Sequence, residues 1–512
     1  MEEKGKPLLI LGIAVIVVLF LSFFGWESIS GGKLKSYDLF NDIRTTPRIE
    51  QKGGGNEYLD PDLAMLNDEL YEFIPEEPIN QTASIDENKE AIVPTESTPD
   101  IDEAESDGAS APEPAETTSE GPASVEGESE TAGETGDPVV NSSKTVAQTA
   151  GKSFEDYSAG NKNIARLKNA LSQTSNRTVR VAVLGDSYIE GDIFTEAIRS
   201  SLQSKYGGRG VGYTPLYSPI AGFRQSVTHN CSGFEQLDFR KKNGRPYSLI
   251  QGFASKAGGG AATTFTGSKV PNAEGWSRSR ILLTAPNGGQ IKVRLGKDNS
   301  AEWTTYNFNP SDSIQVVDLK GETSRLSIGS ISPGIIFQGA YLDDNKGIAI
   351  DNMSIRGYSG IRHNEVDASL TAQARPQIDY DLIILEYGIN GLSSSQTNYK
   401  AYGNRMIEVI NHIKKLYPKA VILVMGIGDR GDKIGGETHS MATVPNMIAE
   451  QRRIAKETGS LFWDTRGAMG GNDAVVAWAK TKDVNSDYIH LTLKGGKRLA
   501  NLFTQALDNT LK

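Results

Sequence analysis

Cysteine is almost absent from this 512-residue chain, and histidine is rare. Cys231 is the single cysteine, and there are five histidines. One thiol excludes an intramolecular disulfide framework and a zinc site built from cysteines. The composition is otherwise ordinary, with 38% hydrophobic and 23% charged residues. Fibrous, collagen-like and wholly disordered proteins are therefore excluded, and two or three folded units are expected.

Aromatic residues are missing, and basic residues nearly so, between Ser84 and Asp137. This stretch holds seventeen acidic residues and one base, Lys89, which gives it a net charge of −16. A segment rich in Pro, Glu, Ser, Thr and Gly cannot bury enough apolar surface to offset the entropy cost of ordering. We expect a disordered linker over residues 81–150. The whole chain has a net charge of −11, so the residues outside this stretch carry +5. A surface charge of this size usually reflects only solubility. We expect no nucleic-acid partner.

Charge is missing from Pro7 to Trp26, where the sequence reads PLLILGIAVIVVLFLSFFGW. About 20 apolar residues are enough to cross a bilayer as a helix. No small-residue cleavage site follows closely, so we expect an uncleaved membrane anchor over residues 1–26 rather than a removed signal peptide. Residues 27–80 are expected to form a juxtamembrane segment, whose function the pattern does not define.

Regular hydrophobic patterning begins after about residue 150. Nearly continuous apolar runs alternate there with segments of helical periodicity, which is typical of a parallel sheet covered by helices on both faces. The expected strands are Val179–Leu184, Leu382–Glu386, Val421–Met425 and Leu461–Trp463. The expected helices include Tyr399–Leu416, Val444–Thr458, Leu493–Leu511 and one after the first strand with Asp192 as its N-cap. This order predicts a three-layer α/β/α fold of the flavodoxin-like kind.

The α/β rhythm is interrupted between residues 208 and 350. This interval is rich in Gly, Ser and Thr and carries short runs such as SRILLTA, QIKVRL and WTTYNF, which predict antiparallel strands. We interpret it as a β-sandwich inserted at a loop of the α/β domain, whose two parts are then 151–207 and 351–512. The tryptophans expected in the core are Trp303, Trp463 and Trp478.

A serine directly follows the first expected strand. Ser187, in Gly185-Asp-Ser, is presented at the carboxyl edge of the sheet, where backbone N–H groups converge. Near the carboxyl terminus, Asp487 precedes His490 by three residues. At this spacing a carboxylate can hold one imidazole nitrogen while the other accepts a serine proton. The other four histidines lack a carboxylate three residues earlier. A capping Asp beside an unrelated His is the alternative interpretation.

Two further blocks lie where strands are expected to end. Asn390 follows the strand Leu382–Glu386, and its amide can donate to a developing oxyanion without adding charge. The block Arg356-Gly-Tyr-Ser-Gly360 contains glycines, which let a backbone N–H approach a reacting carbonyl oxygen. Each block alone is equally compatible with a simple turn.

Taken in order, these blocks resemble the SGNH (GDSL-like) hydrolase superfamily over roughly residues 178–206 and 355–512. The resemblance implies that Ser187 is the nucleophile and that Asp487 and His490 complete its triad. The first block reads GDSY where the common form is GDSL, and the third reads Gly-Ile-Asn-Gly where the common form is Gly-x-Asn-Asp. Neither departure removes a catalytic atom.

The resemblance also implies an oxyanion hole formed by Ser187, Gly360 and Asn390. Gly357 takes the place of Gly360 if the loop is read in another register. Arg362 and Arg430 follow strand ends and are candidates for gripping a glycan or its carboxylate, with a solvated or structural arginine as the alternative for each.

More narrowly, the run GDSYIEGDIFTEAIRSSLQSKYGGRGVGY with a β-rich insert after it is similar to membrane-associated bacterial enzymes that act on O-acetylated cell-wall glycans. The inserts of those enzymes are similar to carbohydrate-binding modules. This likeness implies a serine esterase that removes O-acetyl groups from an envelope polysaccharide such as peptidoglycan. It implies an inner-membrane anchor, a periplasmic catalytic domain and no metal or other cofactor. Acyl transfer to a sugar hydroxyl, or glycan binding without catalysis, are the alternatives. The polymer, the acyl group and the oligomeric state are not defined by the sequence.

Overall fold

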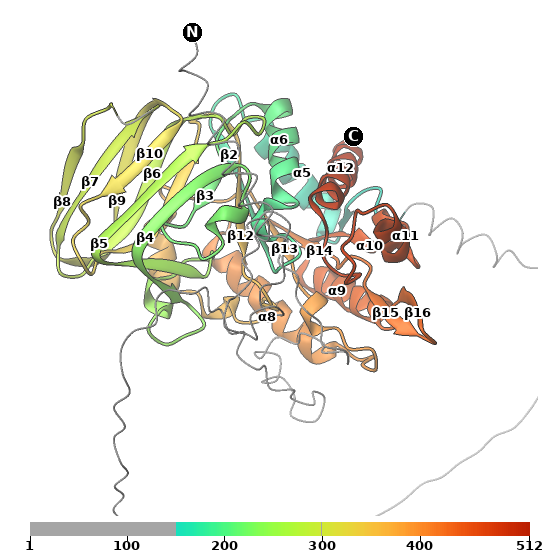
Figure 1. Ribbon diagram of the computed structural model, residues 1–512. Coiled ribbons are helices and arrows are strands. Elements are labelled where there is room, and N and C mark those ends of the chain that lie inside the picture. The colour runs from blue at the N-terminus through green and yellow to red at the C-terminus, as the bar shows by residue number, and fades with distance from the viewer. Residues whose placement is uncertain (1–149, 298–299) are drawn as a thin grey trace, which may run out of the picture. The chain divides into compact units, whose positions relative to one another are not determined.

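A six-stranded sheet forms the centre of one part of the protein (Figure 1), in a computed structural model that describes residues 150–297 and 300–512. The strand order is β1-β17-β14-β13-β2-β12. The bounds are β1 Glu155–Asp156, β2 Thr178–Gly185, β12 Gly347–Ser354, β13 Leu382–Glu386, β14 Val421–Met425 and β17 Leu461–Trp463. All neighbouring pairs are parallel except β1, which joins the edge antiparallel. Every strand expected for this sheet is present.

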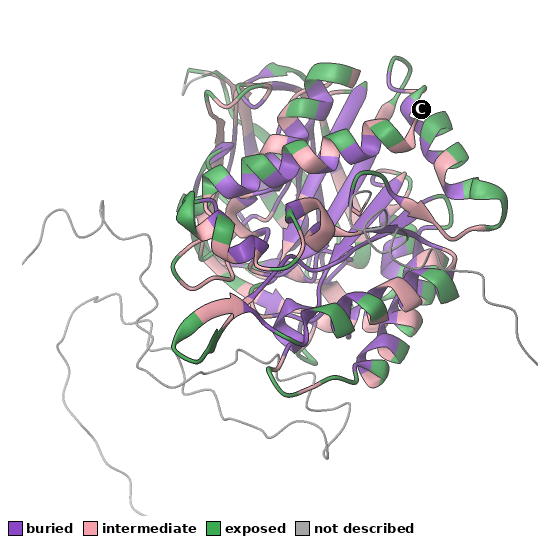
Figure 2. Cartoon of the chain, turned by 90° about the vertical axis from the view of Figure 1, so that its right-hand side faces the viewer, coloured by how far each residue is buried: buried purple, intermediate pink, exposed green. Residues whose placement is uncertain are grey.

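Helices cover both faces of this sheet. In Figure 1, α5, α6 and α12 lie above the strands, and α8 and α9 lie below them. The helix bounds are α5 Lys162–Leu171, α6 Thr195–Tyr206, α7 Ala368–Ala374, α8 Lys400–Leu416, α9 Val444–Thr458, α10 Thr465–Met469, α11 Ala474–Lys480 and α12 Leu493–Thr510. Figure 2 shows buried strands enclosed by helices that turn exposed faces outward. The predicted three-layer α/β/α fold is confirmed.

Between α6 and β12 the chain forms a second, antiparallel sheet, coloured green to yellow in Figure 1. Its strands are β3 Gly212–Thr214, β4 Val227–Asp238, β5 Phe253–Gly267, β6 Trp276–Ala285, β7 Gly289–Gly296, β8 Thr304–Phe308, β9 Ser311–Thr323, β10 Arg325–Gly329 and β11 Ile336–Asp343. The main path runs β8-β7-β10-β5-β11-β6-β9, with β3 on β11 and β4 on β5. β5 pairs with β11 near its start and with β10 near its end. The strands of the expected sandwich are therefore joined by hydrogen bonds into one continuous sheet rather than divided into two separate sheets. We call residues 208–346 the insert.

The return to the α/β sheet comes earlier than expected. β12 begins at Gly347, so the boundary placed at residue 350 falls inside this strand. The periodicity does not predict β12, because its second half carries Asp351 and Asn352. Asp351 is buried, and its charge is matched by Arg180 on the neighbouring strand at 2.8 Å.

The expectation that Asp192 caps α6 is wrong. The helix begins at Thr195, and Asp192 lies before it with a φ of 69°. Its carboxylate is fully buried and pairs with Arg199 at 2.9 Å and Arg224 at 3.0 Å. Asp192 therefore ties the first α/β segment to the insert.

Two of the three tryptophans lie in the core as expected. Trp463 and Trp478 are buried, but Trp303 is 43% exposed, so the expectation for Trp303 is wrong. Trp303 precedes β8, which is the edge strand of the insert, and no other strand within residues 150–297 and 300–512 pairs beyond it. Its ring instead packs against the guanidinium of Arg294, 4.6 Å from the ring centre.

Within residues 150–297 and 300–512, no helix has the length and apolar character needed to span a membrane. The expected anchor over 1–26, the segment 27–80 and nearly all of the linker over 81–150 lie outside the described residues. Those assignments stay predictions.

Candidate active site

Ser187 and His490 meet at the carboxyl edge of the six-stranded sheet. Ser187 lies in the turn after β2, and its Oγ is 2.9 Å from Nε2 of His490, which is 303 positions later in the chain. The turn is tight, because a Cβ on Gly185 would lie 2.8 Å from Glu386 Oε2. The strand and its glycine thus fix the serine where the imidazole can reach it.

Asp487 holds the other side of the imidazole. Its Oδ2 is 2.8 Å from His490 Nδ1, and its Oδ1 accepts the backbone N–H groups of Ile489 at 2.9 Å and His490 at 3.0 Å. Burial by itself raises the pKa of Asp487, but the hydrogen bond and charge of His490 and the two backbone donors bring it below its ordinary value. An ionised Asp487 favours the tautomer whose Nε2 is free to accept a proton from Ser187.

Asn390 lies in a 3-10 turn, Ile389–Gly391, that follows β13. Its side chain is 7% exposed, and its Nδ2 donates to Asp186 Oδ2 at 2.7 Å and to Tyr358 O at 3.4 Å. Asp186 Oδ1 in turn accepts the backbone N–H of Tyr188 at 2.9 Å. Asp186 therefore links the serine turn to the amide that the sequence predicts as an oxyanion donor.

The two glycines of the second block differ in their surroundings. Gly360 has a φ of 85°, and a Cβ there would lie 2.5 Å from Cδ2 of Tyr387. Gly357 has a φ of 68°, and a Cβ there would meet nothing within 4 Å. Gly360 is thus packed against the residue that follows β13, close in sequence to Asn390. Which glycine supplies an N–H stays a prediction.

Glu386 is a carboxyl group that the sequence argument did not assign. It is 1% exposed at the end of β13, its Oε1 has no hydrogen-bond partner among the described residues, and Asp186 N donates to Oε2 at 3.5 Å. Burial raises the pKa of Glu386 well above its ordinary value, and the nearby charge of Asp186 raises it further. Its buried position near the serine turn therefore favours the neutral form of this carboxyl group. A charged residue at the end of an apolar strand is the sequence signal that points to it.

Arg362 and Arg430 both contact protein groups. Arg362 Nη2 donates to Glu365 Oε2 at 3.0 Å and to Arg240 O at 2.7 Å. Arg430 is 7% exposed, and its Nη1 donates to Ile389 O at 3.0 Å, directly beside Asn390. Arg430 therefore contacts the backbone of the third block, and Arg362 lies two residues after the second block. Their expected role in binding substrate stays a prediction.

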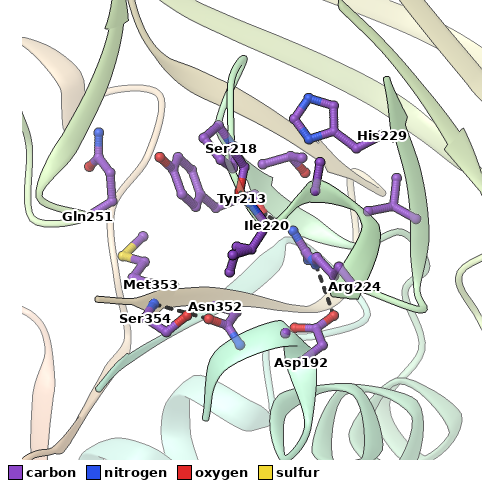
Figure 3. Close-up of a pocket in the computed structure, with 15 residues that line it drawn as sticks. Asp192, Tyr213, Ser218, Ile220, Arg224, His229, Gln251, Asn352, Met353 and Ser354 are labelled. Atoms are coloured by element: carbon purple, nitrogen blue, oxygen red, sulfur yellow. Dashed lines mark hydrogen bonds and ion pairs between the residues drawn. The ribbon is translucent and has the colours of Figure 1, made fainter. Parts of the chain in front are cut away.

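A separate pocket of about 90 Å³ lies between the insert and the edge of the α/β sheet. In Figure 3 the insert contributes Tyr213 and His229, and Asn352 and Ser354 come from the end of β12. Burial lowers the pKa of His229 to about 4, so this imidazole is neutral near pH 7. The triad residues do not line the pocket, so it is not where an ester would meet the serine. No cluster of three potential metal ligands occurs in the described part of the chain.

A serine hydroxyl bonded to an imidazole whose second nitrogen meets a carboxylate can carry out acyl transfer. Residues 337–498 match the model of the GDSL-like Lipase/Acylhydrolase family. This match includes Asn390, Asp487 and His490 but begins after Ser187, because the insert separates β2 from the rest of the sheet.

One solved structure shows the same fold, and others are similar to a lesser degree. One described as a peptidoglycan O-acetylesterase in action is similar with a TM-score of 0.58 and 22% identity, over 70% of this chain and 99% of that one. A family two carbohydrate esterase from Cellvibrio japonicus has a TM-score of 0.24 and 13% identity over 56% of this chain and 98% of its own. Axe2, an acetylxylan esterase from Geobacillus stearothermophilus, has a TM-score of 0.24 and 22% identity over 32% of this chain and 73% of its own. The last two likenesses are too weak to carry an argument. The comparison with curated proteins gives no match.

Proposed function

We propose that this chain is a carboxylic-ester hydrolase of the SGNH type that removes O-acetyl groups from an envelope polysaccharide such as peptidoglycan. The match of residues 337–498 to the model of the GDSL-like Lipase/Acylhydrolase family supports the proposal. The observation that carries the proposal is the 2.9 Å contact between Ser187 Oγ and His490 Nε2, with Asp487 on the other imidazole nitrogen. The description of the first similar structure as a peptidoglycan O-acetylesterase supports this choice of substrate.

The first half of the proposed reaction acylates the serine. His490 Nε2 takes the proton from Ser187 Oγ as that oxygen attacks the carbonyl carbon of the acetyl ester. The carbonyl oxygen becomes an oxyanion, which accepts hydrogen bonds from the Ser187 and Gly360 backbone N–H groups and from the Asn390 amide. The N–H of Asn390 that points to the Tyr358 carbonyl, at 3.4 Å, is the one that turns to the oxyanion. The bond to the sugar oxygen then breaks, and His490 gives its proton to that oxygen. The products are a free sugar hydroxyl and an acetylated Ser187.

The second half releases acetate. Water attacks the acetyl carbon and gives a proton to His490, the same donors hold the second oxyanion, and the bond to Ser187 Oγ breaks as this oxygen regains its proton. Asp487 stabilises the imidazolium in both halves and keeps its own charge. The proton transfers use contacts already formed, Ser187 Oγ to His490 Nε2 at 2.9 Å and His490 Nδ1 to Asp487 Oδ2 at 2.8 Å, which supports the serine mechanism.

The test is release of acetate from O-acetylated peptidoglycan by the full-length chain in detergent. We expect the wild type to release acetate and Ser187→Ala to lose activity by a factor on the order of 10⁴ or more. Ser201→Ala, an exposed serine on α6, is the matched control and is expected to keep full activity. Peptidoglycan that has been chemically de-O-acetylated gives the background. If Ser187→Ala releases acetate at the wild-type rate, the proposal is refuted. If acetyl groups appear on an added glycan, the activity is acyl transfer to a sugar hydroxyl rather than hydrolysis.

We also propose that residues 1–26 anchor the protein in the bacterial inner membrane with the catalytic domain in the periplasm. The uncharged stretch Pro7–Trp26 supports this placement. The full-length chain is expected in the carbonate-resistant membrane fraction, and a chain lacking residues 1–26 in the soluble fraction. Equal distribution of both chains would contradict the anchor.

A further inference from the structure

An aromatic cluster joins the insert to the second block. Phe239, from the insert, stacks on His363 with ring centres 5.3 Å apart and planes at 12°, and it meets the edge of Tyr358 at 5.8 Å. His363 Nε2 is 2.8 Å from the hydroxyl of Tyr387. Tyr358 and Tyr387 are themselves in edge contact at 5.6 Å. One residue of the insert thus completes a ring cluster whose other members belong to the α/β domain.

Polar contacts hold the same junction. We call residues 239–245, which follow β4, the arm. The Arg240 guanidinium lies 5.5 Å from the ring centre of Tyr358, and Arg362 Nη2 donates to Arg240 O at 2.7 Å. At the far end of the arm, Arg245 pairs with Glu365 at 2.5 Å. The arm is therefore fixed at one end to Tyr358 of the second block and at the other to Glu365, which follows that block.

The cluster leads directly to two of the three predicted oxyanion donors, Gly360 and Asn390. The Tyr387 ring is the surface against which Gly360 packs, since a Cβ on Gly360 would lie 2.5 Å from it. The Tyr358 carbonyl accepts from the Asn390 amide at 3.4 Å. A shift of either tyrosine would therefore move a group that must stay aligned with the developing charge.

Phe239 differs in its packing from Phe265, another buried aromatic of the insert. It is fully buried in the hydrophobic core of the α/β domain, together with Tyr358 and Tyr387. Phe265, equally buried, belongs to the separate core of the insert. Phe239 thus packs with the core of the α/β domain, whereas Phe265 packs in the core of the insert.

We propose that the arm is part of the catalytic apparatus and that Phe239 is a positioning residue for the oxyanion hole. The proposal rests on the proposed function, because it takes Gly360 and Asn390 as the oxyanion donors. It assigns the insert a role in the chemical step, separate from any role in holding a polymer.

The test compares Phe239→Leu with Phe265→Leu in the full-length chain, using p-nitrophenyl acetate as substrate. This ester is too small to depend on polymer binding, so a loss reports on the chemical step. Loss of one oxyanion donor costs about 10²–10³ in turnover, and a displaced donor keeps part of its effect. We expect Phe239→Leu to lower kcat about tenfold with KM changed less than about twofold. Phe265→Leu is expected to keep wild-type kcat, and Phe239→Tyr, which keeps the ring face against His363, to keep most of it.

Equal kcat values for Phe239→Leu and Phe265→Leu, or a rise in KM alone for Phe239→Leu, would overturn the positioning role. If Phe239→Leu does not fold, Arg240→Ala is used in its place to test the role of the arm. The Arg240 side chain is partly exposed, so its removal does not open the core. A fall in kcat for Arg240→Ala supports the role of the arm, and an unchanged kcat overturns it. Absence of Ser187-dependent hydrolysis in the wild type would instead refute the proposed function, and the positioning role with it.

Discussion

Replacing Asp487 by Asn tests the orientation of the imidazole more sharply than deletion of the side chain. In the structure, Oδ1 of Asp487 accepts two backbone N–H groups, and Oδ2 faces His490 Nδ1 at 2.8 Å. The amide oxygen of Asn must stay with the two backbone donors, so its NH₂ group faces Nδ1. His490 then presents a lone pair at Nδ1 and carries its proton on Nε2. In that tautomer it cannot accept the proton of Ser187.

We therefore expect Asp487→Asn to lower kcat by about 10⁴, as the equivalent change does in a serine protease triad. Asp487→Ala leaves the tautomer unforced and is expected to lose less. The assay is p-nitrophenyl acetate hydrolysis by the full-length chain, with Asp508→Asn, an exposed acid on α12 paired with Lys205, as the control. The reasoning about the tautomer is refuted if kcat of Asp487→Asn stays within about tenfold of the wild-type value. It is also refuted if kcat of Asp487→Asn is higher than that of Asp487→Ala.

Three further predictions concern the groups around the serine turn. Asn390→Ala is expected to lower kcat by about 10²–10³ with little change in KM, measured on the same ester, and an unchanged kcat would remove Asn390 from the oxyanion hole. Gly360→Ala is expected to abolish activity because its Cβ would meet the Tyr387 ring. A Cβ at Gly357 would meet nothing within 4 Å, so Gly357→Ala is expected to keep at least half of the wild-type activity. If Gly357→Ala loses activity and Gly360→Ala keeps it, the two glycines exchange roles. Burial raises the pKa of Glu386 well above 4.5, so the folded state keeps a proton that the unfolded state releases. Stability from this group is complete below pH 4.5 and declines by about 1.4 kcal/mol per pH unit as the pH rises toward the raised pKa. Urea unfolding of Glu386→Gln is expected to lack that decline, and parallel pH curves for variant and wild type would contradict it.

The sequence was sufficient for features that depend on local pattern. The apolar runs Val179–Leu184 and Leu382–Glu386 correspond to strands because a strand buried on both faces is apolar throughout. Ser187 and Asn390 could be brought to one edge because parallel strands place their carboxyl ends together, whereas the place of His490 followed from the order of the blocks. The structure puts Ser187 and His490 in contact, as the order of the blocks predicts.

Features that depend on distant partners could not be predicted from local pattern. β12 escaped detection because Asp351 is compensated by Arg180 from another strand. Asp192 looks like a helix cap, but its partners Arg199 and Arg224 draw it into a buried cluster. The contact between Phe239 and His363 joins residues on different domains, and no periodicity records it.

Acetylation of Ser187 is the most direct test of the account. Full-length protein is mixed with an acetyl ester, quenched with acid within the first turnovers, digested and analysed by mass spectrometry. The account predicts that the peptide containing Ser187 gains one acetyl group, that the modification disappears as the ester is consumed, and that Ser187→Ala neither gains the group nor releases acetate. Acetate release at the wild-type rate by Ser187→Ala, or an acetyl group that forms at another residue and turns over there, would contradict it.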